Sequence, residues 1–136
     1  MKVLLDANVV LDVLLDRPPH FAASAAVWSA IEAGTAEGLL SAHAVTTIHY
    51  LIRKEQGAAK AGQTLTAILR VFGVAMVDER VILEALEMHA PDFEDSVTAA
   101  AAELAGCDLI VTRDPKGFRG SPVRALAPEA AAPLLV

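Results

Sequence analysis

Short runs of apolar residues alternate along the chain with longer segments whose apolar residues recur every three or four positions. A run of four or five apolar residues that ends at a polar one is typical of a buried strand, whereas the longer period is typical of a helix with one face in the core. On this basis we predict strands at residues 2–6, 38–41, 74–77, 108–112 and 123–126.

The segments between these strands have the pattern of helices. We expect helices over residues 8–16, 21–33, 42–57, 61–72, 78–90 and 95–106, and a short terminal helix that starts at Pro128. Gly34 suits a C-terminal cap and Asp78 an N-terminal cap, and proline is favoured in the first turn of a helix.

Short buried strands separated by helices predict a mostly parallel sheet with helices on both faces, because parallel neighbours need a crossover between them. A chain of 136 residues is long enough to bury such a core in one unit. We therefore expect a single domain over residues 1–136, an α/β/α sandwich with about five strands.

Composition narrows the functional classes. No apolar run approaches the length that crosses a bilayer, and the N-terminus lacks the basic-then-apolar layout of a signal peptide, so we expect a cytoplasmic protein without membrane contacts. The net charge of −6 argues against a general phosphate-coating surface, although an enzyme that holds cations on carboxylates is also acidic. The lone Cys107 is expected to be a small buried hydrophobe.

Acidic residues follow two of the predicted buried strands. Asp6 ends the first strand, and Asp114 comes shortly after the strand at 108–112. In parallel sheets of this class, ligands bind beyond the carboxyl ends of the strands. Asp92 and Asp95 lie three residues apart at a helix start, a spacing that places two side chains on the same face.

Each acid also has a simpler interpretation. Asp92 or Asp95 could be a helix N-cap, and Asp114 could open a turn. Asp6 is harder to explain in this way, since a carboxylate directly after a buried strand is costly unless it is paired or coordinated. Several acids at one edge of the sheet would repel one another, and a hard divalent cation such as Mg²⁺ or Mn²⁺ would relieve that repulsion. Such an ion could activate a water and stabilise a phosphodiester transition state.

Neighbouring polar residues fit a site of this kind. Asn8 could orient a carboxylate ligand or a water, or cap the helix, and Thr112 could contact a phosphate or a carboxylate. Arg113, Lys116 and Arg119 could bind a nucleic-acid backbone, although a solvated loop would explain them equally well.

With these residues in view, the sequence resembles the PIN-domain family of metal-dependent ribonucleases, which includes VapC-type toxins. The stretch LLDANVVLDVLLDR resembles the opening motif of the family, and DSVTAAAAELAGCDLIVTRDPKGF resembles its closing motif. Asp95 and Gly106 keep the eleven-residue spacing of the closing motif, so Asp95 rather than Asp92 corresponds to the third acid of the family.

The resemblance implies a PIN-like fold and a divalent-metal-dependent endoribonuclease that cleaves single-stranded RNA as the toxin of a toxin–antitoxin pair. Asp6, Asp95 and Asp114 would be the catalytic acids and would hold Mg²⁺ or Mn²⁺, with Asp92 as a further ligand. A homodimer and an antitoxin protein partner are also implied.

One position departs from the family. Its second acid is usually a Glu six residues after a Ser, and the count from Ser41 reaches Thr47. Asp92 could compensate, or the protein could be a catalytically weak or inactive module that binds RNA or protein. A phosphatase or receiver-like domain with Asp6 as nucleophile fits less well, because no lysine is suitably placed after a late strand. We expect no zinc site at His20, His43 or His89, which lack the clustered His and Cys ligands of such sites.

Overall fold

A computed structural model describes all of residues 1–136, and its five strands form one parallel sheet in the order β3-β2-β1-β4-β5. The strands are β1 (Lys2–Leu5), β2 (Glu37–Ser41), β3 (Gly73–Ala75), β4 (Leu109–Val111) and β5 (Ala125–Leu126). The helices are α1 (Ala7–Leu14), α2 (Phe21–Glu32), α3 (Ala42–Gln56), α4 (Ala58–Ile68), α5 (Glu79–Met88), α6 (Phe93–Leu104) and α7 (Pro128–Ala131), with short 3₁₀ turns η1 (Pro115–Phe118) and η2 (Ala132–Leu134). Every predicted strand and helix is present.

Several boundaries differ from the prediction for local reasons. Helix α4 starts at Ala58 rather than at residue 61, because Gly57, with φ of +91°, ends α3 and leads directly into the next helix. Helix α6 starts at Phe93 rather than at residue 95, because Asp92 caps it. Strand β5 keeps only two of its four predicted residues.

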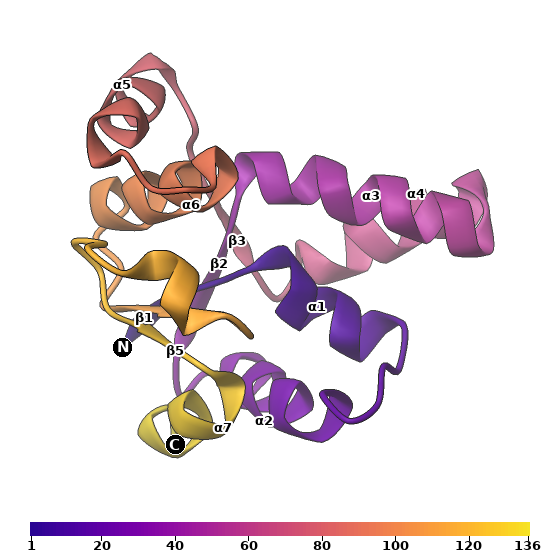
Figure 1. Cartoon of the computed structure of the whole chain (residues 1–136). Helices are drawn as coiled ribbons and strands as arrows, with labels where there is room; N and C mark the ends of the chain where they lie inside the picture. The colour runs from indigo at the N-terminus through magenta and orange to yellow at the C-terminus, as the bar shows by residue number, and fades with distance from the viewer.

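Adjacent side chains of the central strands point into two separate cores, as the pleat of a strand requires. Val3 and Leu5 pack with α1, α2, α3, α4 and α7, whereas Leu4 packs with α5 and α6 on the opposite face. Figure 1 shows α5 and α6 on one side of the sheet and α1, α2 and α7 on the other, with the α3–α4 hairpin extending sideways. The α/β/α sandwich is confirmed. Cys107 is buried in the second core, as expected, and burial raises the pKa of its thiol to about 11.

The strand order places the carboxyl ends of β1 and β4 side by side. The chain runs outward from β1 to β2 and β3 and then returns to the other side of β1 as β4, where Leu5 pairs with Val111. A crevice at such a reversal is the usual ligand site in open parallel sheets. No helix is both long and apolar enough to span a membrane.

Candidate active site

Asp6 leaves β1 and caps α1. Its Oδ1 accepts a hydrogen bond of 2.8 Å from the Ala7 amide, and its Oδ2 accepts one of 3.0 Å from the Thr112 hydroxyl. Because both oxygens are engaged, the carboxylate has a fixed orientation at the end of the strand. Asn8 is exposed and Asp6 holds the cap position, so the interpretation of Asn8 as the helix cap is wrong.

Thr112 connects the two strand ends. Besides donating to Asp6, its buried hydroxyl oxygen accepts a hydrogen bond of 3.1 Å from the Asp114 amide. The Asp114 side chain is exposed and makes no capping hydrogen bond to η1. One hydroxyl therefore links the Asp6 carboxylate to the backbone that carries Asp114.

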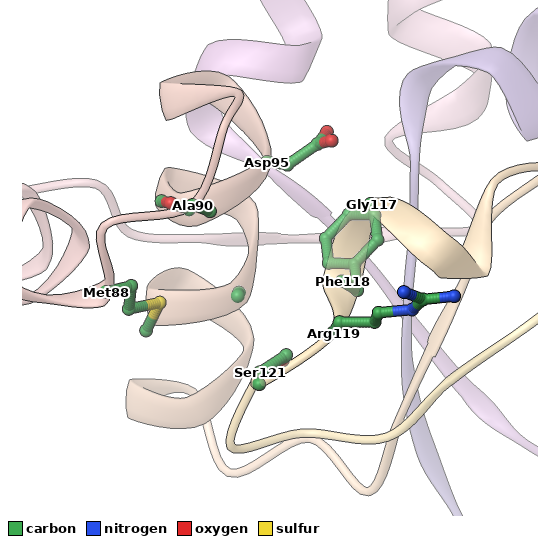
Figure 2. Close-up of a pocket in the computed structure, with 10 residues that line it drawn as sticks. Met88, Ala90, Asp95, Gly117, Phe118, Arg119 and Ser121 are labelled. Atoms are coloured by element: carbon green, nitrogen blue, oxygen red, sulfur yellow. The ribbon is translucent and has the colours of Figure 1, made fainter.

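The start of α6 supplies the other acids. Asp92 is the N-cap and its Oδ1 accepts a hydrogen bond of 2.9 Å from the Glu94 amide, which confirms the capping interpretation for this residue. Asp95 lies in the first turn, where it is half-buried. Figure 2 shows its side chain extending from α6 toward the turn that carries Gly117 and Phe118.

These acids form what we call the acidic cluster: Asp6, Asp92, Glu94, Asp95 and Asp114. Burial raises the pKa of Asp95 to about 6, and repulsion from the other four members adds to the shift, with Asp92 contributing most among them. Burial also raises the pKa of Asp6, while hydrogen bonds from Thr112 and Ala7 act in the opposite direction. Three separate chain segments thus bring negative charge to one place, which is the environment that a cation would stabilise.

Gly117 keeps a space open between two members of the acidic cluster. A Cβ atom at this position would lie 2.8 Å from Asp95 Oδ2 and 3.3 Å from Asp114 Oδ2. Beside it, Asp95, Ser96, Phe118 and Ser121 line a hollow of about 20 Å³, which is room for about one water.

The donor set fits a hard divalent cation. As they stand, no three His, Cys, Asp or Glu side chains are close enough together to hold a metal ion by protein atoms alone. Mg²⁺ typically keeps several waters and takes only one or two carboxylates from the protein. The open acidic cluster therefore suits this ion, which does not need a closed site made of protein atoms alone.

Thr47 contributes no charge to the site. Its hydroxyl donates to the His43 carbonyl at 3.5 Å, one turn earlier in α3. His43 itself faces the acidic cluster: its Nε2 lies 3.3 Å from Thr98 Oγ1 on α6. Burial lowers the pKa of His43, and the negative charges of Glu94 and Asp6 oppose that shift. His43 therefore lies one helical turn before Thr47, the position that corresponds to the second acid of the family.

The three basic residues differ in their surroundings. Lys116 and Arg119 are exposed beside the acidic cluster, and they remain candidates for binding a nucleic-acid backbone. Arg113 is half-buried and its Nε lies 3.2 Å from Asp12 Oδ2, so its guanidinium already has an acidic partner inside the protein.

Two residues near the site were not found from the sequence. Asp12 is fully buried in α1. The only sign of it in the sequence is an acidic residue between apolar residues that have the spacing of a buried helix face. His43 was considered only as a zinc ligand, and its position two residues after the end of β2 was the available signal.

This chain is similar to known proteins in sequence and in fold. Ribonuclease VapC1 of Aquifex aeolicus (strain VF5) is 27% identical over 132 residues, which cover 94% of this chain and 91% of the relative. FitAcB from Neisseria gonorrhoeae matches the fold with a TM-score of 0.74 at 22% identity, over 93% of this chain and 97% of that one. VapBC2 from Rickettsia felis, bound to a DNA fragment from its promoter, matches with a TM-score of 0.71 at 14% identity, over 93% and 98%.

The PIN domain family model matches residues 2–116, which is most of the chain. The opening and closing motifs both lie wholly or largely within that range. The protein therefore belongs to the PIN-domain family.

Proposed function

We propose that this protein is a Mg²⁺- or Mn²⁺-dependent endoribonuclease that cleaves single-stranded RNA. The observation that carries the proposal is the convergence of acids from three chain segments, which contributes to raising the pKa of Asp95 to about 6. The identity with a relative named as a ribonuclease, VapC1, supports the same activity.

In this proposal Asp6, Asp95 and Asp114 would hold the ion, in part through its bound waters because no three acidic side chains lie close enough to bind it directly, and Asp92 would assist from the helix cap. When bound, Mg²⁺ or Mn²⁺ would supply an activated water and offset negative charge at the phosphodiester. The chain itself orients the ligands, since the Thr112 hydroxyl fixes the rotation of the Asp6 carboxylate. Lys116 and Arg119 would bind the RNA backbone next to the acids.

Substitution of the strand-end acids tests the proposal. Asp6→Asn and Asp114→Asn keep the size of each side chain and should abolish metal-dependent cleavage of single-stranded RNA. Asp16→Asn, at an exposed acid beyond the end of α1, is the matched control and should cleave like the wild type. Full activity in either of the first two variants would show that the acidic cluster is not the catalytic site.

We also propose that the protein is the toxin of a toxin–antitoxin pair, is cytoplasmic and forms a homodimer. Solved structures with the same fold include those named FitAcB and VapBC2, and one described as a toxin–antitoxin complex from Klebsiella pneumoniae. Induced expression in a bacterium should then arrest growth, whereas expression of Asp6→Asn should not. Equal growth of both cultures would contradict the toxin role.

The environment of Thr47 favours a second candidate function, a PIN-like module that binds RNA or protein but cleaves poorly. Position 47 is a threonine where the family usually has a carboxylate, and its hydroxyl is turned to the α3 backbone instead of the site. Calorimetric titration with Mn²⁺ and a cleavage assay on the same preparation separate the two functions. Binding of RNA without cleavage at saturating Mn²⁺ would favour the module.

A further inference from the structure

Asp12 is a buried acid in the middle of α1. The residue is 0% exposed, and the residues before it in the helix, Val10 and Leu11, belong to the first core. Three groups approach it: Arg113 Nε at 3.2 Å, Ser24 Oγ at 3.4 Å and Arg17 at 3.9 Å. Even so, Asp12 Oδ1 has no hydrogen-bond partner, and the Arg113 Nε–H is not aligned for a hydrogen bond despite its short distance. The contact with Arg113 is therefore an attraction between charges and not an aligned hydrogen bond.

A buried ion pair of this kind is weak evidence for stability, since well-packed apolar residues often replace such pairs at no loss. Its position suggests a different role. Arg113 lies between Thr112, which donates to Asp6, and Asp114, whose amide donates to Thr112. At the start and middle of α1, Asp6 and Asp12 thus hold Thr112 and Arg113, two successive residues of the segment that follows β4.

We propose that Asp12 is a positioning residue of the acidic cluster. Through Arg113 it holds residues 112–114 against α1 and so sets where Asp114 lies relative to Asp6. This role gives Arg113 an internal function in place of contact with RNA. The expected effect on metal binding and cleavage rests on the proposed function. The positioning itself does not, because it can be measured without metal or RNA.

The experiment compares Asp12→Asn and Arg113→Gln with Arg17→Gln. Arg17 approaches the same carboxylate but is not attached to residues 112–114, so its substitution is the matched control. The metal-independent readout is amide hydrogen exchange by NMR in EDTA. The Asp114 amide should exchange about tenfold faster or more in the first two variants, relative to the Ile110 amide of β4 in the same sample. Arg17→Gln should leave that ratio unchanged.

The second readout is Mn²⁺ affinity by calorimetry, with RNA binding and cleavage kinetics beside it. Outer partners of metal ligands typically change metal affinity or activity by about 10- to 100-fold. We expect losses of that size in Mn²⁺ affinity and kcat for both variants, with KM for RNA unchanged. The double variant should be no worse than either single one, because both substitutions break the same link. Arg113→Lys, which keeps the charge, should recover part of the loss.

The outcomes separate this proposal from the proposed function. If Asp114 and Ile110 exchange speed up together, Asp12 has only a structural role and the positioning proposal is overturned. Faster exchange at Asp114 alone supports positioning, even where the wild type neither binds Mn²⁺ nor cleaves RNA, which would count against the ribonuclease instead. If Asp12→Asn does not fold, Arg113→Gln and Arg113→Lys, at a side chain that is 30% exposed, give the same decision.

Discussion

The Thr112 hydroxyl donates a hydrogen bond of 3.0 Å to Asp6 Oδ2 across the neighbouring ends of β4 and β1. The same oxygen accepts from the Asp114 amide, so one buried side chain joins the two strand-end acids. Neither acid alone would define a site, since Asp6 is a helix cap and Asp114 opens a short turn. Their connection through Thr112 makes them parts of one arrangement.

Thr112→Val should weaken both stability and activity. Valine keeps the shape but removes the donor, so the partly buried Asp6 carboxylate loses a hydrogen bond to a charged group, a loss of about 1–3 kcal/mol in free energy of unfolding. Because that hydrogen bond lowers the pKa of Asp6 against the effect of burial, the pKa of Asp6 should rise in the variant. We expect cleavage to fall by about tenfold or more.

Urea unfolding, NMR titration of Asp6 and the cleavage assay measure these effects. Thr112→Ser retains the hydroxyl and is the control, which should stay near the wild type in all three. Equal behaviour of the serine and valine variants would mean that the hydroxyl does not join the two acids.

The sequence predicts some parts of the site and not others, for physical reasons. Asp6 and Asp114 could be predicted because an acid that follows a buried parallel strand lies at the carboxyl edge of the sheet, and this does not depend on contacts with distant residues. The capping role of Asp92 was also predictable, because a cap depends on neighbours two residues away. Asp12 and Arg113 are about a hundred residues apart, and only the pairing of β1 with β4 brings them together.

Strand ends were less predictable for a related reason. The apolar run at 74–77 predicts a strand that includes Met76 and Val77, but β3 ends at Ala75. Its pairing partner β2 ends at Ser41, opposite Ala75, where α3 begins. The partner strand, rather than the local pattern, sets the length of this edge strand.

Asp95→Asn should stabilise the metal-free protein at neutral pH while it abolishes activity. The pKa of Asp95 is raised from 3.8 to about 6, so the folded chain holds this proton more tightly than the unfolded chain does. Between about pH 4 and 6 stability therefore falls as pH rises, and above pH 6 the ionised group destabilises the fold. Allowing for its partial exposure, we expect a gain of about 1 kcal/mol in Asp95→Asn at pH 7.5 and none at pH 4.

Urea unfolding in EDTA at the two pH values measures that gain. Bound metal needs the ionised carboxylate, so Mn²⁺ affinity and cleavage by the wild type should decline as pH falls below about 6. Glu129→Gln, at an exposed acid of α7, is the control for a general effect of charge. A stability difference that does not change between pH 4 and 7.5 would rule out the charge of Asp95 as its cause.

Gly117→Ala should affect the site more than the fold. The new Cβ would lie 2.8 Å from Asp95 Oδ2, and a carboxylate at the end of a side chain can move away at little cost. We expect the free energy of unfolding to stay within about 1 kcal/mol of the wild type, and Mn²⁺ affinity to fall by about tenfold or more as Asp95 is displaced. Gly62→Ala, in a helix with no atom within 4 Å of the added Cβ, is the matched control. Unchanged Mn²⁺ affinity in Gly117→Ala would show that the ion does not bind between Asp95 and Asp114.

Two substitutions of Asp92 separate its role as a helix cap from its role as a metal ligand. Serine accepts the same hydrogen bond from the Glu94 amide but carries no charge, whereas alanine removes both functions. Asp92→Ala should lose about 1 kcal/mol of stability relative to Asp92→Ser. Both should bind Mn²⁺ less tightly if Asp92 is a ligand, and both should have a lower pKa at Asp95, because Asp92 is the strongest of the charges that raise it. Wild-type Mn²⁺ affinity in Asp92→Ser would leave Asp92 a cap only.

Thr47→Glu should strengthen the site if the missing family acid limits catalysis. Thr47 lies one helical turn after His43, and residues four apart in a helix share a face. Since His43 faces Thr98 and the acidic cluster, a carboxylate at position 47 would be on the side of α3 that can reach the ion.

We expect Mn²⁺ affinity and the cleavage rate of Thr47→Glu to increase by about tenfold. Thr46→Glu adds the same charge to an exposed position one residue earlier and should change neither. If Thr47→Glu instead weakens Mn²⁺ binding while Thr46→Glu does not, the His43 side of the site is not a vacant ligand position. The set of metal ligands would then need no second acid.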